Sequence, residues 1–397
     1  MFSSNLSTAR LLLRFLNLIT VYPLSILTWI PLRILSTRYK VSIYVLKTFR
    51  PGWGSTYTEM MEPLCRQLQF ENNTHHIKIL VDPGKSVNDV LVKSYKSHFT
   101  IYLDDKKKIF RLIAYLIPKS GLEKHFINTS NNFKPSWILK PSKNYANLEN
   151  KLPADLSDIG IKKNNFVLFA HASKNYYKDR VSKEVFLNLE HRFYDLSSYG
   201  PALTKLIENN YKVVRIGLQV DALPSALKEL PIIDYTGKNR TEIGELWLYE
   251  NCKFLLSATS GAYWLARRFD RPTLLTNSYV LPFGYYSTLY TPMTFRSIDT
   301  GKILSLVEMH ELRKKPDYLE NQFMRVNRVE LMPNSSLTIA NAVEEILNVS
   351  NESRVPTSED LKLMDRYNAI LASYNIAIVE KMTTPAISFL REYRHLL

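Results

Sequence analysis

The sequence predicts an α/β protein built from two Rossmann-like domains. The chain has 397 residues, which is long for a single hydrophobic core. In both halves, short apolar runs rich in β-branched residues alternate with segments of helical periodicity, a pattern typical of parallel sheets. Between the halves, residues 130–163 contain several prolines and many Asn and Lys residues without a sustained period, as expected of an interdomain connection.

The composition narrows the class of protein. Hydrophobic residues make up 45% and charged residues 22% of the chain, which is ordinary for a globular protein. Cys65 and Cys252 fall in different halves, so neither a disulfide framework nor a zinc site is expected. The formal net charge of +15 favours anionic partners, with simple solubilisation of the surface as the alternative. The basic runs at 106–108 and 313–315 are short, and no nucleic-acid-binding signature occurs, so we expect no nucleic-acid partner.

The N-terminal segment differs from the rest of the chain. Residues 15–32 (FLNLITVYPLSILTWIPL) carry no charge and have basic residues on both flanks. Their length just permits a membrane span. Pro23, Pro31 and the two basic flanks instead favour a segment that lies in an anionic membrane surface. We therefore expect a peripheral or monotopic protein at the cytoplasmic face of the inner (cell) membrane, with a buried first helix of the core as the alternative.

The first half begins with an expected strand at 41–46, a turn that contains Gly52 and Gly54, and a helical pattern that includes Glu59. A second strand is expected at 76–81, directly before Asp82, and a third at 99–103, with a helix at 87–95 between them. The glycines of the first turn allow a ligand to approach the backbone, although an ordinary tight turn explains them equally well. We expect this domain to span 40–150, after the membrane-associating segment 1–39.

The second half shows the alternation more clearly. Strands are expected at 166–170, 212–217, 232–235, 254–258 and 273–277, with helices at 198–209, 241–249 and 261–269. After these we expect a long loop, a helix at 336–347 and a helical tail from 358 onward. The corresponding parts are a second Rossmann-like domain at 151–350 and a C-terminal helical tail at 351–397.

The sharpest local motif is SATSG at 257–261, between an expected strand and an expected helix. A helix N-terminus has unpaired N–H groups and a partial positive charge, so Thr259, Ser260 and Gly261 can bind a phosphate there. Ordinary N-cap chemistry is the alternative. The motif is neither a Walker loop nor G-x-G-x-x-G, and no Asp-x-Asp pair occurs, which disfavours a divalent-metal site of that kind.

Three further residues are candidates for chemistry. Arg215 interrupts the apolar strand VVRIG, so it either contacts a ligand or forms an ion pair with an acid such as Asp234. His171 and Arg192 lie on loops after the first strand of the second half. A lone histidine is more often structural than catalytic, but its pKa suits a general base.

The stretch from 166 to 282 resembles a family of bacterial glycosyltransferases found among surface-polysaccharide genes. The resemblance depends on Arg192, Tyr199-Gly200-Pro201-Ala202, Tyr211 to Gly217, Ile233-Asp234-Tyr235, Asn251 to Phe254, Ser260-Gly261, Arg271-Pro272 and Thr276-Asn277. It implies a GT-B-like arrangement, in which two Rossmann-like domains face a cleft and the C-terminal one binds the donor without a required metal or cofactor. Two segments depart from the family pattern, Arg192-Phe193 and Ala170-His171-Ala172.

Together these features predict a glycosyltransferase that moves a sugar from a nucleotide-sugar donor to a lipid-linked glycan acceptor of surface polysaccharide, such as lipopolysaccharide. The alternatives are a non-catalytic membrane-bound scaffold that binds nucleotides or anions, a nucleotide-sugar epimerase and a basic nucleic-acid binder. The residues assigned to the donor phosphates are Arg215, Gly217, Thr259, Ser260, Gly261 and Asn277; those assigned to the acceptor or cleft are Arg192, Gly52 and Gly54; the candidate bases are His171, Glu59 and Asp82.

Overall fold

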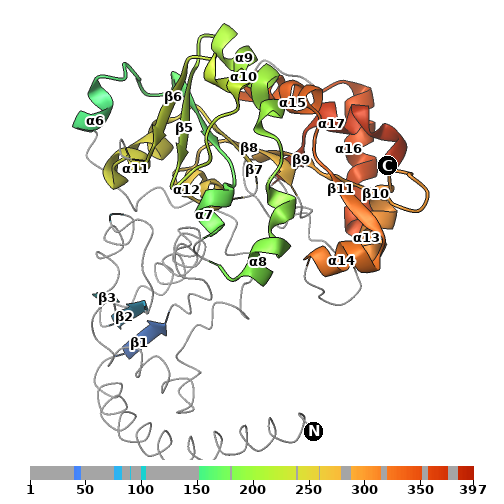
Figure 1. Cartoon of the computed structure of the whole chain (residues 1–397), viewed down its shortest axis with the longest axis horizontal. Helices are drawn as coiled ribbons and strands as arrows, with labels where there is room; N and C mark the ends of the chain where they lie inside the picture. The colour runs from blue at the N-terminus through green and yellow to red at the C-terminus, as the bar shows by residue number, and fades with distance from the viewer. Residues whose placement is uncertain are drawn as a thin grey trace, which may run out of the picture. The chain divides into compact units, whose positions relative to one another are not determined.

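The computed structural model describes residues 40–45, 76–82, 90, 100–103, 152–178, 181–237, 240–258, 260–278, 288–313, 320–350, 356–373 and 383–397. The chain divides into two compact units, Met1–Trp137 and Ile138–Leu397, which we describe separately. Figure 1 shows both units and labels their elements. The expected membrane-associating segment, together with Gly52, Gly54 and Glu59, lies outside the described residues. Among the residues that are described, no helix has the length and apolar character needed to cross a membrane.

The described strands of unit 1 form a parallel sheet in the order β1-β2-β3. They are β1 (Lys40–Val45), β2 (His76–Asp82) and β3 (Thr100–Leu103). Their positions agree with the strands expected from the apolar runs, and their parallel pairing agrees with the expected alternation of strands and helices. Asp82 is the last residue of β2 and pairs in register with Leu103.

In the described part of unit 2, seven parallel strands form one sheet in the order β12-β9-β8-β7-β4-β5-β6. They are β4 (Phe166–Ala170), β5 (Lys212–Gly217), β6 (Ile232–Thr236), β7 (Leu255–Ala258), β8 (Thr273–Ser278), β9 (Thr288–Pro292) and β12 (Thr383–Pro385). The chain enters at β4, continues outward to β5 and β6, and then returns to β7 on the other side of β4. The strand order therefore reverses between β4 and β7, the topological feature of a doubly wound fold.

Helices cover both faces of this sheet (Figure 1). On one face, α9 (Gly200–Glu208) packs against α15 (Ser336–Ser350); on the other, α11 (Glu242–Asn251) packs against α12 (Gly261–Arg268). Right-handed crossovers require opposite faces for α9 and α12, because the chain moves in opposite directions along the sheet at these two connections. The strands are buried as a consequence, and all residues of β4, β7 and β8 are buried.

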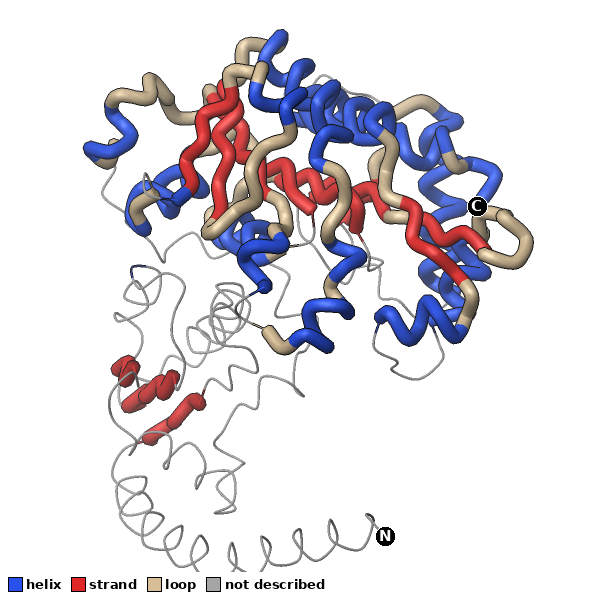
Figure 2. The backbone as a smooth tube through the Cα atoms, in the orientation of Figure 1, coloured by secondary structure: helices blue, strands red, loops and turns tan. Residues whose placement is uncertain are grey.

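The remaining helices of unit 2 are short or peripheral. The described ones, coloured as helix in Figure 2, are α6 (Ala154–Ser157), α7 (Lys174–Lys178), α8 (Lys183–Asn188), η5 (Glu190–Arg192), η6 (Leu196–Tyr199), α10 (Ser225–Lys228), α13 (Leu306–Arg313), α14 (Glu320–Val326), α16 (Ser358–Ser373), α17 (Ile387–Glu392) and η8 (Arg394–Leu396).

The expectation of a long loop after residue 277 was wrong. This region contains β9, an antiparallel pair formed by β10 (Thr294–Ser297) and β11 (Val329–Met332), and the helices α13 and α14. The strands are only four or five residues long, and β9 pairs with the distant β12 as well as with β8, while β11 pairs with β10 across two helices. Such pairings leave no local hydrophobic period for a sequence window to detect.

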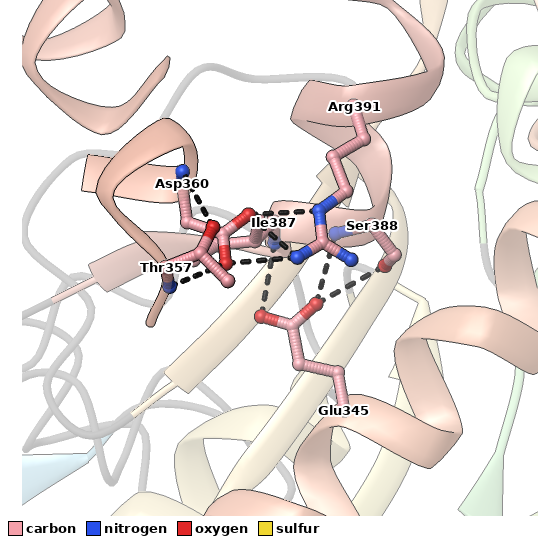
Figure 3. Close-up of polar contacts among 6 residues, drawn as sticks. All are labelled: Glu345, Thr357, Asp360, Ile387, Ser388 and Arg391. Carbon is pink, nitrogen blue, oxygen red and sulfur yellow. Dashed lines mark hydrogen bonds and ion pairs between the residues drawn. The ribbon is translucent and has the colours of Figure 1, made fainter. Parts of the chain in front are cut away.

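The C-terminal elements join the same unit, because β12 adds to the edge of the sheet beside β9. Figure 3 shows two carboxylates that hold these elements in place. Glu345 of α15 accepts hydrogen bonds from the first backbone N–H groups of α17, at Ile387 (2.9 Å) and Ser388 (3.0 Å). Asp360 of α16 accepts two hydrogen bonds from Arg391, from Nε (2.7 Å) and Nη2 (2.8 Å). Both carboxylates are buried. Glu345 places a negative charge at the N-terminus of α17 and links the tail to α15, whereas Asp360 joins α16 to α17 within the tail.

Candidate functional site

The candidate site lies at the carboxyl ends of β4 and β7, where the strand order reverses. Open α/β sheets bind ligands at this position, because the loops diverge there. His171 follows β4 directly, Gly217 is the last residue of β5, and Ser260 and Gly261 follow β7 at the start of α12. Thr259 lies outside the described residues. The structure therefore places the described members of the SATSG motif at the edge where a ligand was expected.

The start of α12 consists of small residues that are partly exposed. Ser260 and Gly261 both have intermediate exposure, whereas Ser257 on β7 is completely buried. The Ser257 hydroxyl donates to the carbonyl oxygen of Ala258 (2.7 Å) and lies 3.1 Å from the Ser260 hydroxyl. The first N–H groups of a helix have no partner inside that helix. This turn therefore offers a phosphate backbone donors and one side-chain hydroxyl.

Arg215 forms a buried network at the ends of β4, β5 and β6. Its Nη1 donates to Asp234 (3.2 Å), which is the ion pair that the sequence offered as an alternative to ligand binding. Its Nη2 contacts His171 Nε2 (3.0 Å) and also donates to the backbone carbonyl of Asp221. The Arg215 side chain is only 2% exposed, whereas that of Asp234 is 46% exposed. Arg215 thus joins three strand ends from inside the protein, and a direct ligand contact by Arg215 stays a prediction.

His171 is held as a neutral acceptor. Its Nδ1 lies 3.1 Å from the carbonyl oxygen of Ala172, so Nδ1 carries the proton and Nε2 accepts from Arg215. Burial lowers the pKa of His171 to about 4, because the imidazolium would lose its hydration beside a guanidinium. A general base needs a free lone pair and a pKa near the working pH. This geometry gives no support to His171 as the base.

Asp221 was not singled out by the sequence, yet it organises one side of the site. Its carboxylate accepts from the backbone N–H groups of Lys174 (2.8 Å) and Asn175 (3.2 Å), at the start of α7. Ser173 Oγ adds a hydrogen bond to the carbonyl of Gln219 (3.1 Å), which joins the same two loops. A Rossmann dinucleotide site places its pyrophosphate on the helix that follows the first strand. In this protein a carboxylate of the chain itself fills that position.

Gly217 and Asn277 have conformational roles in the structure. Gly217 has φ +146°, and an added Cβ would lie 2.5 Å from Val220 Cγ1, so the loop after β5 requires glycine there. Asn277 has φ +50° and exchanges two hydrogen bonds of 2.6 Å with Asn334, each between a backbone N–H and a side-chain oxygen. These contacts explain both residues without a ligand. Their contact with donor phosphates remains a prediction.

Arg192 and Asp82, which the sequence also assigned to the site, take no part in the contacts described above. Arg192 ends η5, and its Nη1 donates to the hydroxyl of Tyr177 on α7 (3.4 Å). Asp82 ends β2 in unit 1. Within the described ranges, no group of three or more His, Cys, Asp or Glu side chains is arranged to hold a metal ion.

Three residues at the site escaped the sequence reasoning: Ser257, Asp221 and Tyr199. Ser257 belongs to the SATSG motif and to the strand expected at 254–258, but the sequence assigned it no role of its own. Asp221 caps a helix 47 residues earlier in the chain, so no local spacing signals its role. The hydroxyls of Tyr199 and Thr276 lie 2.6 Å apart, although 77 residues separate them in the sequence. Ser257 and Asp221 lie near the carboxyl ends of β7 and β5, which was the available signal for these two, whereas Tyr199 lies in η6 and had no such signal.

Comparison with known proteins finds no matching family model and no matching curated protein. Among solved structures, the iron-containing heptosyltransferase TibC of enterotoxigenic E. coli, in complex with ADP-D-β-D-heptose, is 15% identical and aligns over 64% of this chain and 61% of its own, with a TM-score of 0.34. The E. coli ADP-heptose lipopolysaccharide heptosyltransferase II is 13% identical over 63% and 90%, with a TM-score of 0.36. A UDP-N-acetylglucosamine 2-epimerase is 9% identical over 80% and 97%, with a TM-score of 0.33. This chain spans less than two thirds of the length of TibC.

Proposed function

We propose that this protein is a glycosyltransferase that uses a nucleotide-sugar donor, and that the donor diphosphate binds at the start of α12. One observation carries the proposal. The turn with Ser260 and Gly261 is partly exposed at the reversal of the strand order, while Asp221 fills the competing position at α7. A ligand with phosphates is favoured at α12 and disfavoured at α7, which argues for a nucleotide sugar rather than a dinucleotide cofactor.

The chemistry follows from this placement. In sugar transfer, the bond between the anomeric carbon and the diphosphate breaks while an acceptor hydroxyl forms the new glycosidic bond. Negative charge grows on the departing diphosphate, and fixed N–H dipoles at the start of α12 stabilise it. The acceptor hydroxyl must lose its proton to a base. Because Arg215 occupies His171 Nε2, His171 is not favoured for that role, and Glu59 and Asp82 remain the other candidate bases from the sequence.

We further propose that the acceptor is a lipid-linked glycan of bacterial surface polysaccharide, reached at the cytoplasmic face of the cell membrane. The support is the charge-free stretch 15–32 with basic residues on both sides. Residues 1–137 carry 19 Lys and Arg against 8 Asp and Glu, a balance of 19 − 8 = +11 out of the +15 of the whole chain. The positive excess is thus concentrated in the unit that contains the expected membrane segment, which suits an anionic surface.

The donor site is tested by comparing two glycines that each begin a helix. Gly261 starts α12 and Gly200 starts α9, where an added Cβ would meet only Leu227 Cδ2 at 3.6 Å. Binding of UDP-, GDP-, CMP-, dTDP- and ADP-linked sugars is measured by calorimetry. Gly261→Val should weaken binding of the preferred donor at least tenfold, about 1.4 kcal/mol, because the side chain occupies the position of the phosphate. Gly200→Val should bind as the wild type does.

Two results would overturn the proposal: a folded Gly261→Val protein that binds the donor normally, or a wild-type protein that binds none of these donors. Turnover is measured separately as release of the free nucleotide in the presence of lipid-linked acceptor. Binding without turnover would favour the non-catalytic alternative.

A further inference from the structure

The hydroxyl of Ser257 lies buried directly beneath the turn at the start of α12. Ser257 is completely buried, and its Oγ lies 3.1 Å from the partly exposed Ser260 Oγ. We propose that Ser257 is a positioning residue: it changes from acceptor to donor in its hydrogen bond with Ser260, so that the Ser260 hydroxyl donates to the ligand phosphate. The inference rests on the proposed function of this turn.

The two serine hydroxyls share two protons, and their distribution decides whether Ser260 can donate to a ligand. Each hydroxyl has one proton to donate. While Ser257 donates to the carbonyl of Ala258 (2.7 Å), Ser260 is the donor in the bond between the two serines and presents only lone pairs to a ligand. When Ser257 donates to Ser260 instead, the Ser260 proton is released for an outside acceptor. Phosphate oxygens accept strong hydrogen bonds, so a bound diphosphate favours the second arrangement.

A chain of hydrogen bonds fixes the backbone that carries Ser257. The side-chain oxygen of Asn277 accepts from Asn334, so its amide nitrogen donates to the Tyr199 hydroxyl (3.3 Å). Tyr199 then donates to Thr276 (2.6 Å), which donates to the carbonyl of Ser257 (3.5 Å). All three bonds run in one direction and end at β7. The backbone of Ser257 is therefore held in place by β8. Its hydroxyl can still donate either to the Ala258 carbonyl oxygen or to the Ser260 hydroxyl.

A purely structural role makes a different prediction from a positioning role. If Ser257 only fills space and satisfies Ala258, its loss lowers stability and leaves ligand affinity unchanged. If it positions Ser260, its loss lowers affinity through Ser260, and the two substitutions are not additive. Thr273 provides a matched control, since it is equally buried on the neighbouring strand and its hydroxyl also bonds to a backbone carbonyl, that of Arg271 (3.2 Å).

The experiment measures dissociation constants of UDP and ADP by calorimetry, and melting temperatures, on the full-length protein. We expect Ser257→Ala to weaken binding of the preferred diphosphate about five- to tenfold, the scale of one typical hydrogen bond. The double variant with Ser260→Ala should bind no more weakly than Ser260→Ala alone. Ser257→Thr keeps the hydroxyl, so it should bind within about twofold of wild type even where its extra methyl group lowers the melting temperature. Thr273→Val should change stability without changing affinity.

The outcomes separate the two proposals. If the wild type binds neither diphosphate nor any of the five nucleotide sugars, the proposed function of the turn and this inference fall together. If the wild type binds and Ser257→Ala binds equally well, or if the two serine substitutions weaken binding additively, only the role of Ser257 is overturned. Should Ser257→Ala not fold, Thr276→Val removes the donor on β8 that holds the Ser257 carbonyl and must weaken binding for the inference to survive.

Discussion

Replacing Arg215 by methionine tests whether the buried network at the strand ends stabilises the fold. The substitution removes the donors to His171 Nε2 and to the Asp221 carbonyl, and leaves two buried acceptors without partners. Each such loss costs about 1–3 kcal/mol. The broken pair with Asp234 adds less, because that carboxylate is 46% exposed and can be hydrated. Methionine suits an apolar strand and returns part of the loss.

We expect a net destabilisation of roughly 3 kcal/mol, which corresponds to a fall in melting temperature of about 6–12 °C for a domain of this size. Thermal and urea unfolding of the full-length protein measure it. Arg296→Met is the matched control, because Arg296 also lies in a strand and pairs with a carboxylate, Glu330, but both side chains are exposed (42% and 45%). The control should melt close to the wild type.

A variant Arg215→Met that is as stable as the wild type, or more stable, would refute the structural argument. Ligand affinity measured on the same protein then decides the other possibility. Normal stability with lost donor binding would show that Arg215 contacts the ligand, as the sequence had suggested. Reduced stability with normal affinity per folded molecule would show that the network only supports the loops.

Three further predictions concern other parts of unit 2. Burial lowers the pKa of His171 from 6.5 to about 4, so its contribution to stability is complete above pH 6.5 and is lost as the pH falls toward 4, by about 3 kcal/mol in total. His171→Gln should therefore flatten the pH dependence of the free energy of unfolding in urea between these two values. An unchanged pH dependence would contradict the assignment. Gly244→Ala places a Cβ 2.0 Å from the Tyr235 hydroxyl and should destabilise the protein by about 1–3 kcal/mol. Gly200→Ala is the control, because its added Cβ has its nearest contact at 3.6 Å and should leave stability unchanged. Equal melting temperatures for the two variants would show that the packing argument fails. Glu345→Gln turns one acceptor into a donor that faces backbone N–H groups of α17, and we expect a loss of about 1–3 kcal/mol with faster hydrogen exchange in that helix; exchange at the wild-type rate would count against the cap.

Much of the fold was predictable from local patterns. The strands at 166–170 and 212–217 have the expected bounds, and the parallel pairing follows from the alternation of strands and helices. The first strand is a continuous apolar run, and the second is apolar except for Lys212 and Arg215, which is the pattern expected of strands buried on two faces. The elements that were missed, β9 to β11 and β12, are three to five residues long. They are strands because distant partners pair with them, and this cause leaves no trace in a local window.

In the candidate site, too, some features follow from local sequence and others from the tertiary structure. Composition, strand periodicity and the SATSG motif determined that unit 2 is a parallel α/β domain with a polar turn at the carboxyl end of one strand, because these features depend on neighbouring residues. Tertiary structure alone decided that Arg215 pairs with Asp234 and His171, that Asp221 fills the start of α7, and that Asn277 locks to Asn334. A buried charge or amide must find a partner, but which of the available groups it finds depends on which strand ends the folded chain brings within about 3 Å of one another.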